Sequence, residues 1–210
     1  MKLDLYQYLT VYGSVYSTIH KLFDYEYYVD WTEKNFNYVK YNPRKKIDRL
    51  GLSLTSLDGQ MNGIPDLDSL YEYNRENNTS YSERDFKTFT PAYEFETLKN
   101  IFSPIQNYIF RSHVLKINPG GFFPPHRDVR GMNFDNYRII VPLQNMNPPY
   151  FNFIVDGQIQ YWECGYLYFV DTAKSHYLFN SSFEPSYLIV FNVDLNTNTV
   201  KFITENLKVR

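Results

Sequence analysis

The sequence is poor in several residue types that define common protein classes. It holds one cysteine in 210 residues, Cys164, which excludes an intramolecular disulfide and a zinc site built from cysteines. A reducing, cytoplasmic location is the simplest expectation for such a chain. Alanine occurs twice, whereas aromatic residues make up 19% of the chain. This composition disfavours a helical bundle and favours pleated, half-buried β structure.

An excess of charge of one sign and long hydrophobic runs are also missing. Lys+Arg 21 and Asp+Glu 23 leave a net charge of -2, which argues against a protein that binds nucleic acid mainly through phosphate contacts. No stretch approaches the roughly 18 apolar residues of a membrane span. The segment Met1–Thr10 has no long apolar run and does not look like a signal peptide. We therefore expect neither nucleic acid nor a membrane among the partners.

The pattern of polar and apolar residues changes near residue 105. Residues 1–105 mix polar and aromatic residues without steady alternation, and we expect an N-terminal helical and loop-rich cover within a single domain of residues 1–210. Helices are predicted over Leu5–Phe23 and Tyr93–Ile105, and a strand over Gly51–Leu57.

Residues 106–210 show the pattern of one short strand after another. The turn Asp156-Gly157 between two alternating segments is a strong hairpin signal. Short strands without intervening helices are typical of an antiparallel sandwich or barrel, so we predict a mainly β fold with a jelly-roll core. The expected strands are Tyr108–Ile117, Tyr137–Leu143, Phe151–Val155, Gln158–Trp162, Gly165–Val170 and Tyr187–Val193, with Val200–Thr204 closing an edge.

A short motif in this half carries candidate chemistry. His126 and Asp128 lie two apart in an extended segment, so their side chains point the same way. His176, which follows the strand Gly165–Val170 after a short loop, is the natural third ligand. Two histidines and one carboxylate with open positions are the ligand set of non-haem Fe(II) oxygenases. The competing interpretation of the motif is a loop histidine that caps a turn.

The ordered set of segments resembles the Fe(II)/2-oxoglutarate dioxygenases, especially the aspartyl/asparaginyl β-hydroxylase and proline hydroxylase branch. The similarity spans about residues 108 to 194 and rests on these pieces: His126-Arg127-Asp128, Arg138-Ile139-Ile140-Val141-Pro142-Leu143, Trp162-x-x-Gly165, Phe169-x-Asp171, and His176 with Asn180 four residues later. The resemblance implies a double-stranded β-helix that binds Fe(II) through His126, Asp128 and His176, with 2-oxoglutarate beside the metal.

The same resemblance assigns further roles. Arg138 matches an arginine that faces the cosubstrate and would supply a planar fork for a carboxylate. The family usually carries a second arginine about ten residues after the distal histidine, where this chain has Ser186. Ser186 and Asn180 are therefore secondary candidates on the cosubstrate side. Asp171 is a candidate hydrogen-bond partner for His176, or else the cap of a turn.

Three functions compete at this level. The first is an oxygenase that hydroxylates a C–H bond of an amino acid, a peptide side chain or a similar small polar substrate. The second is a cupin-like metal-binding jelly roll without 2-oxoglutarate turnover, an isomerase or a binding protein. The third is an interaction domain that keeps the fold alone. His113 and His20 are interpreted as packed or surface residues, and Cys164 as a small buried residue.

Overall fold

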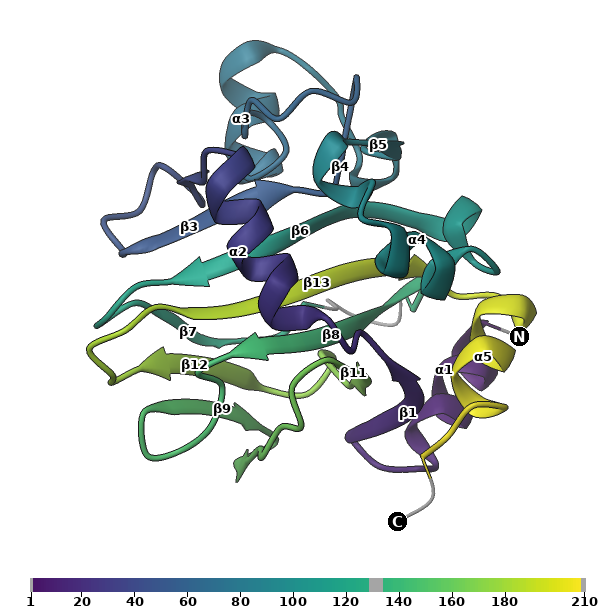
Figure 1. Cartoon of the computed structure of the whole chain (residues 1–210). Coiled ribbons are helices and arrows are strands. Elements are labelled where there is room, and N and C mark those ends of the chain that lie inside the picture. The colour runs from purple at the N-terminus through teal and green to yellow at the C-terminus, as the bar shows by residue number, and fades with distance from the viewer. Residues whose placement is uncertain (1, 129–133, 209–210) are drawn as a thin grey trace.

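Two antiparallel sheets form the body of the protein, confirming the mainly β jelly-roll fold (Figure 1). The computed structural model describes residues 2–128 and 134–208. The larger sheet has seven strands in the order β1 (Val15–Lys21), β11 (Tyr166–Val170), β8 (Asn136–Gln144), β13 (Ser186–Asp194), β6 (Ile109–Ile117), β3 (Arg49–Ser53) and β2 (Val39–Lys40). The smaller sheet has four, β10 (Gln158–Ile159), β9 (Phe151–Val155), β12 (His176–Asn180) and β7 (Phe122–His126).

The two faces of the larger sheet bury separate apolar clusters. Alternate residues of a strand point to opposite faces, so Leu188 faces the smaller sheet while Ile189 faces the helices. The inner cluster fills the space between the sheets: Leu115, Ile117, Ile140, Met146, Phe151, Phe153, Val155, Trp162, Tyr168, Val170, Leu178 and Leu188. A strand buried on both faces reads as a continuous apolar run, which explains residues 187–191.

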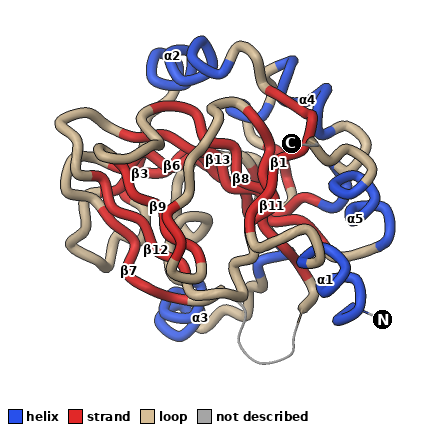
Figure 2. The backbone as a smooth tube through the Cα atoms, turned by 90° about the horizontal axis from the view of Figure 1, so that it is seen from below, coloured by secondary structure: helices blue, strands red, loops and turns tan. Residues whose placement is uncertain are grey.

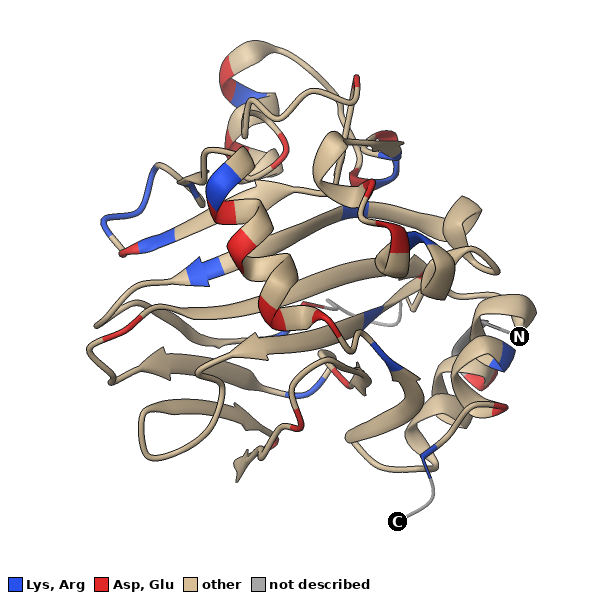
Figure 3. Ribbon diagram, viewed as in Figure 1, with Lys and Arg blue, Asp and Glu red and all other residues tan. Residues whose placement is uncertain are grey.

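Helices cover the outer face of the larger sheet. They are α1 (Lys2–Thr10), α2 (Tyr25–Asn35), α4 (Glu96–Phe102) and α5 (Thr197–Thr204), and α3 (Leu70–Asn77) lies nearer the end of the roll. Figure 2 shows α2 and α4 on the side of β6, β13 and β8 that faces away from β9, β12 and β7. Charged residues line α2, while the strands behind it are mostly uncharged (Figure 3), as a cover with one apolar face requires.

Several predicted elements are corrected by the structure. The segment Leu5–Phe23 is not one helix: α1 ends at Thr10, and Val15–Lys21 is a strand paired with β11. Val200–Thr204 is not an edge strand but the body of α5, which Asn196 caps with its side chain. The predicted strand Gly51–Leu57 is divided between β3 and β4 (Thr55–Ser56), and β4 pairs with β5 (Thr88–Phe89).

The N-terminal half does more than cover the roll. It contributes β1, β2 and β3 to the larger sheet, so the strands of the two halves share one hydrogen-bonded layer. The hairpin at Asp156-Gly157 is confirmed, with both residues at positive φ as the turn requires. Among the described residues, no helix combines the length and hydrophobicity needed to cross a bilayer.

Candidate metal centre

Two neighbouring strands of the smaller sheet bring the histidines together. His126 ends β7 and His176 begins β12, and the two residues are direct cross-strand partners. Their ring centroids lie 4.2 Å apart. β7 holds Pro124 and Pro125, which an edge strand tolerates because its outer N–H groups need no partner. Two prolines are therefore compatible with the strand that carries the first candidate ligand, because this strand lies at the edge of the smaller sheet.

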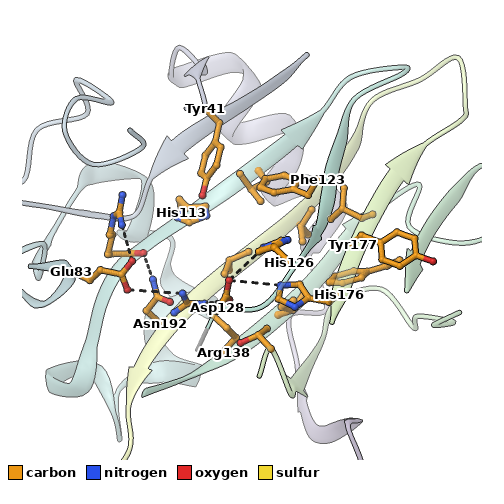
Figure 4. Close-up of a pocket in the computed structure, with 18 residues that line it drawn as sticks. Tyr41, Glu83, His113, Phe123, His126, Asp128, Arg138, His176, Tyr177 and Asn192 are labelled. Atoms are coloured by element: carbon orange, nitrogen blue, oxygen red, sulfur yellow. Dashed lines mark hydrogen bonds and ion pairs between the residues drawn. The ribbon is translucent and has the colours of Figure 1, made fainter. Parts of the chain in front are cut away.

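Asp128 completes the group from the segment just beyond β7. Its backbone N–H donates to the Thr172 carbonyl at 3.0 Å, which fixes the chain at this point. Asp128 Oδ1 lies 3.4 Å from His126 Nε2 and 3.8 Å from His176 Nε2 (Figure 4). Ligand atoms of the three residues all lie within 4.8 Å of one another. The predicted convergence of His126, Asp128 and His176 is therefore present in the structure.

The hydrogen bonds of the histidine rings fit a metal site. His126 Nδ1 lies 2.8 Å from the Pro124 carbonyl, and His176 Nδ1 lies 3.0 Å from the Lys174 carbonyl. A carbonyl oxygen only accepts, so in each ring Nδ1 carries the proton and donates it. In the neutral rings each Nε2 then keeps its lone pair for a metal, as in histidines that ligate metals. The donor set of two imidazoles and one carboxylate fits a divalent transition metal such as Fe(II).

Electrostatics keep the carboxylate available as a ligand. Burial opposes ionisation of Asp128, but the Arg138 guanidinium and His126 outweigh it and hold the pKa of Asp128 well below its usual range. The hydrogen bond that the protonated His126 ring can donate to Asp128 raises the pKa of His126. Burial lowers the pKa of His176 and favours its neutral, ligating form.

The three residues open onto a pocket between the two sheets. The inward face of β6 places Arg111, His113 and Leu115 along one wall, two residues apart. The pocket is apolar toward the interior of the roll and polar near the triad. Its other walls come from these residues: Tyr41, Glu83, Phe123, Arg138, Ile140, Phe153, Thr172, Tyr177, Leu178, Leu188, Val190 and Asn192.

Arg138 lies in the pocket as expected, and it is engaged with a metal-ligand candidate. Its Nε donates to Asp128 Oδ2 at 3.2 Å, and its Nη1 lies 3.4 Å from Asn136 Oδ1. Nη2 points toward Glu83 Oε2 at 4.0 Å. The side chain is 13% exposed and lines the pocket, and its neighbours are Asp128, Asn136 and Glu83.

Three other predicted residues are not brought to the triad. Ser186 is buried at the far end of β13 and donates to the Asn145 carbonyl at 2.7 Å. Asn180 closes the far end of β12, where its amide donates to the Ile117 and Glu184 carbonyls. Neither lines the pocket. Asp171 accepts from Tyr6 Oη at 2.7 Å and from the Ala173 N–H, while His176 Nδ1 faces a backbone carbonyl instead.

The structure adds pocket residues that the sequence analysis did not assign. His113 was interpreted as a packed strand residue; it is buried, but it lines the pocket, and no described residue satisfies its Nδ1. Burial and the nearby Arg111 lower the pKa of His113 to about 3. The alternation along β6 was a readable signal for Arg111 and His113. No local sequence pattern predicted that Tyr41, Glu83 or Asn192 would line the pocket, because they come from other elements.

Another buried cation lies behind the pocket wall. The Arg49 guanidinium packs on the Phe123 ring at 3.9 Å and donates to the Phe122 carbonyl. Burial lowers its pKa, and within the described part of the chain it makes no ion pair. Arg49 pairs with Ile117 across the sheet, and Ile117 also pairs with Ser186. A cation thus lies two strands away from Ser186, the position at which the sequence resemblance would place an arginine.

Comparisons with known proteins address the fold. No family model matches the sequence, and no curated protein matches it significantly. An oxidoreductase of the 2OG-Fe(II) oxygenase family from Burkholderia pseudomallei superposes with a TM-score of 0.50 at 10% identity, covering 93% of this chain and 92% of that one. The cupin domain of Schizosaccharomyces pombe Cnp3 gives 0.33 at 13% identity, over 41% of this chain and 56% of the domain. A predicted oxalate decarboxylase from Thermotoga maritima gives a TM-score of 0.31 at 17% identity, over 46% of this chain and 74% of that one. The chain therefore has a jelly-roll fold that is similar, over 93% of its length, to that of the Burkholderia oxidoreductase.

Proposed function

We propose that the protein is a non-haem Fe(II)- and 2-oxoglutarate-dependent oxygenase that hydroxylates a C–H bond. The observation that carries this proposal is the geometry of the triad. Two histidine Nε2 atoms and Asp128 Oδ1 converge at the polar end of a pocket whose remaining side is open. A ligand set that occupies one face of a metal leaves positions for two further molecules. The Burkholderia neighbour shows that the same fold occurs in a 2OG-Fe(II) oxygenase family.

The chain's own residues would hold and orient the reactants. When bound, Fe(II) would supply activation of O2, coupled to oxidative decarboxylation of 2-oxoglutarate. Arg138 keeps Asp128 ionised and turned toward the histidines. Leu115, Ile140 and Leu188 line the inner part of the pocket and exclude water there. Holding the substrate carbon in a dry, shaped cavity is the protein's main contribution to such chemistry.

For the cosubstrate we propose a carboxylate contact with Arg138. Arg138 lines the pocket, its Nη2 has among the described residues only the distant contact with Glu83 at 4.0 Å, and a planar fork suits a carboxylate better than a lysine does. Tyr41 replaces Ser186 as the hydroxyl that lies in the same pocket. The substrate would be an amino acid, a peptide side chain or a similar small polar molecule, acted on in the reducing cytoplasm that the single cysteine favours.

One observation favours the alternative of a cupin-like metal-binding protein without 2-oxoglutarate turnover. The first residues of β13, where the related oxygenases carry a carboxylate anchor, hold Ser186 and Leu188. Ser186 is bonded to a backbone carbonyl, and Leu188 faces an apolar interior. A cosubstrate carboxylate placed there would have no cation in contact and would be costly to bury.

Metal content and turnover discriminate between these functions. Protein purified without chelator is reconstituted with Fe(II) anaerobically, titrated with 2-oxoglutarate, and then exposed to O2 while succinate release is measured. Tight Fe(II) binding with O2-dependent succinate release supports the oxygenase, even before the substrate is known. Metal binding without 2-oxoglutarate binding favours the cupin-like alternative. Absence of metal binding under every condition would leave an interaction domain.

A further inference from the structure

Arg111 lies on the pocket wall in an unusual backbone conformation. Its φ is +36°, in the left-handed region that non-glycine residues rarely adopt. The pairing of β6 with β13 shifts register at this point, between Val190 and Asn192. Asn192 supports the irregularity, because its amide donates to the Arg111 carbonyl at 2.6 Å. Bulges of this kind re-aim a side chain, and they concentrate next to functional sites.

The guanidinium of Arg111 is fixed by neutral groups on one edge. Nε donates to the Asp66 carbonyl at 3.1 Å, and Nη2 donates to the Asp68 carbonyl at 2.5 Å. Both acceptors are backbone atoms and carry no net charge. The side chain is 15% exposed, so its positive charge needs an anion on the remaining edge.

Glu83 supplies that anion in the present structure. Its Oε1 accepts from Arg111 Nη1 at 2.7 Å, and its Oε2 lies 4.0 Å from Arg138 Nη2 (Figure 4). One carboxylate thus faces both arginines of the pocket. The Glu83 side chain is 39% exposed, more than either arginine, so it can leave by rotating toward solvent.

The backbone that carries Glu83 is held independently of this contact. Glu83 begins the short 3-10 helix Glu83–Asp85, which Ser82 and Asp85 cap reciprocally. The next residue, Arg84, bonds to Asp135 and Asp194 at the ends of β8 and β13. Departure of the Glu83 side chain would therefore leave both its helix and the Arg111 guanidinium in place.

The charge balance of the pocket points to an anionic ligand. Among the described lining residues, the charges of Arg111 and Arg138 balance those of Glu83 and Asp128. A divalent metal at the triad would leave two positive charges uncompensated. A ligand carboxylate that enters would find both arginines oriented, with one internal carboxylate to displace.

We infer that Arg111, together with Arg138, forms a carboxylate-binding subsite beside the metal centre, and that Glu83 fills this subsite until a ligand carboxylate replaces it. The inference rests on the proposed function for the identity of the neighbouring metal, but not for the subsite itself. The carboxylate can come from the cosubstrate or from the substrate, since both would enter this pocket.

Calorimetric titration with glutarate tests the subsite. Glutarate lacks the 2-oxo group that chelates metals, so its binding reports on the arginines. In the parent, the Glu83 carboxylate occupies the subsite, so the apparent affinity for glutarate is reduced in proportion to the fraction of molecules whose subsite is free. Glu83→Gln should therefore bind glutarate about ten-fold more tightly than the parent. Glu76→Gln removes a comparable carboxylate, 2.6 Å from Arg44 and outside the pocket, and should match the parent. A Glu83→Gln variant that binds glutarate no more tightly than the parent would overturn the inference.

A second variant keeps the test informative. Adding Arg111→Lys to Glu83→Gln retains the charge but removes the fork, and should cancel the gain in glutarate affinity. Thermal unfolding establishes that the variant is folded; an unchanged gain in a folded double variant would contradict the role of Arg111. If 2-oxoglutarate displaces glutarate, the subsite takes the cosubstrate carboxylate; if both bind together, it takes that of the substrate. Loss of O2-dependent succinate release alone would count against the oxygenase and leave this result standing.

Discussion

Arg138 Nε donates to Asp128 Oδ2 at 3.2 Å, and this contact leaves Asp128 Oδ1 as the oxygen that faces both histidines. The arginine would therefore act on the candidate metal site through Asp128, one of its candidate ligands. Burial alone would lower the pKa of Arg138, but the charges of Asp128 and Glu83 and the hydrogen bond to Asp128 together raise it, and the pKa of Asp128 is lowered. Both directions describe one favourable ion pair at the edge of the pocket.

Arg138→Ala should weaken two functions at once. Losing one partner of a buried charged pair costs on the order of 3–5 kcal/mol, so 2-oxoglutarate binding should weaken by roughly two to three decades. The pKa of Asp128 should also rise, so Fe(II) should dissociate at a higher pH than from the parent. Anaerobic titration followed by spectroscopy measures both. Binding of 2-oxoglutarate equal to that of the parent would remove Arg138 as the anchor.

His126→Ala should remove Fe(II) binding, because two of three ligands cannot hold the metal in competition with water. Changes outside the first ligands already cost about 10–100-fold in metal affinity, so loss of a ligand should exceed about 100-fold. Iron content after anaerobic reconstitution measures this. His20→Gln is the control, because His20 stacks on Phe202 outside the pocket and should keep full iron content. Full iron content in His126→Ala would rule out the site.

His113 should make the protein less stable in mild acid. Its pKa is lowered to about 3 in the folded protein, mainly by burial, against about 6.5 when unfolded. Below pH 6.5 the unfolded chain gains a proton that the folded chain does not, so the stability present above pH 6.5 is lost as the pH falls. Between pH 6.5 and pH 5 this amounts to about 2 kcal/mol. Urea unfolding of the parent and His113→Gln should show a shallower decline in the variant; parallel curves would contradict this.

Asp66 should have the opposite pH dependence. Burial raises its pKa to about 6, so the folded state favours its neutral form. A penalty therefore appears as the pH rises from about 4 to about 6, and persists above. Asp66→Asn keeps an acceptor for Ser53 Oγ and should be more stable than the parent at pH 7 by about 2 kcal/mol, but not at pH 4.

Thermal unfolding at the two pH values checks the Asp66 prediction. Asp156→Asn is a suitable control for the substitution itself, because Asp156 lies exposed in the β9–β10 turn, and it should change stability little. An Asp66→Asn gain that is equal at pH 4 and pH 7 would show that packing, and not ionisation, is responsible.

Local signals in the sequence predicted most of the strands. The apolar run of β13 and the turn Asp156-Gly157 depend on neighbours in the chain, so they were readable in advance. Two segments were assigned the wrong kind of secondary structure, and in both the local signal was weak. Val15–Lys21 becomes a strand because it pairs with β11, whereas the helical cap at Asn196, which explains α5, was overlooked.

The candidate metal triad was predicted from the sequence, but the residues that contact it were mostly not. His126 and Asp128 are two apart in an extended segment, and this period is a property of the backbone itself. That His126 and His176 lie close together was only an expectation from the sequence. The pairing of β7 with β12 makes them neighbours in the structure. Ser186 and Asn180 were assigned by position in a resembling pattern, and the strand register places them elsewhere. Asp171 accepts from the Ala173 N–H, which agrees with the turn-capping alternative and not with a contact to His176.

By itself, the sequence determined the fold class, most of the core strands and the chemistry of the candidate ligands, because alternation and turn residues act over a few positions. Tertiary structure alone decided that Glu83 meets Arg111 and that Arg138 binds Asp128. These contacts join separate elements through sheet register and a bulge, and a single sequence does not encode register in any local pattern.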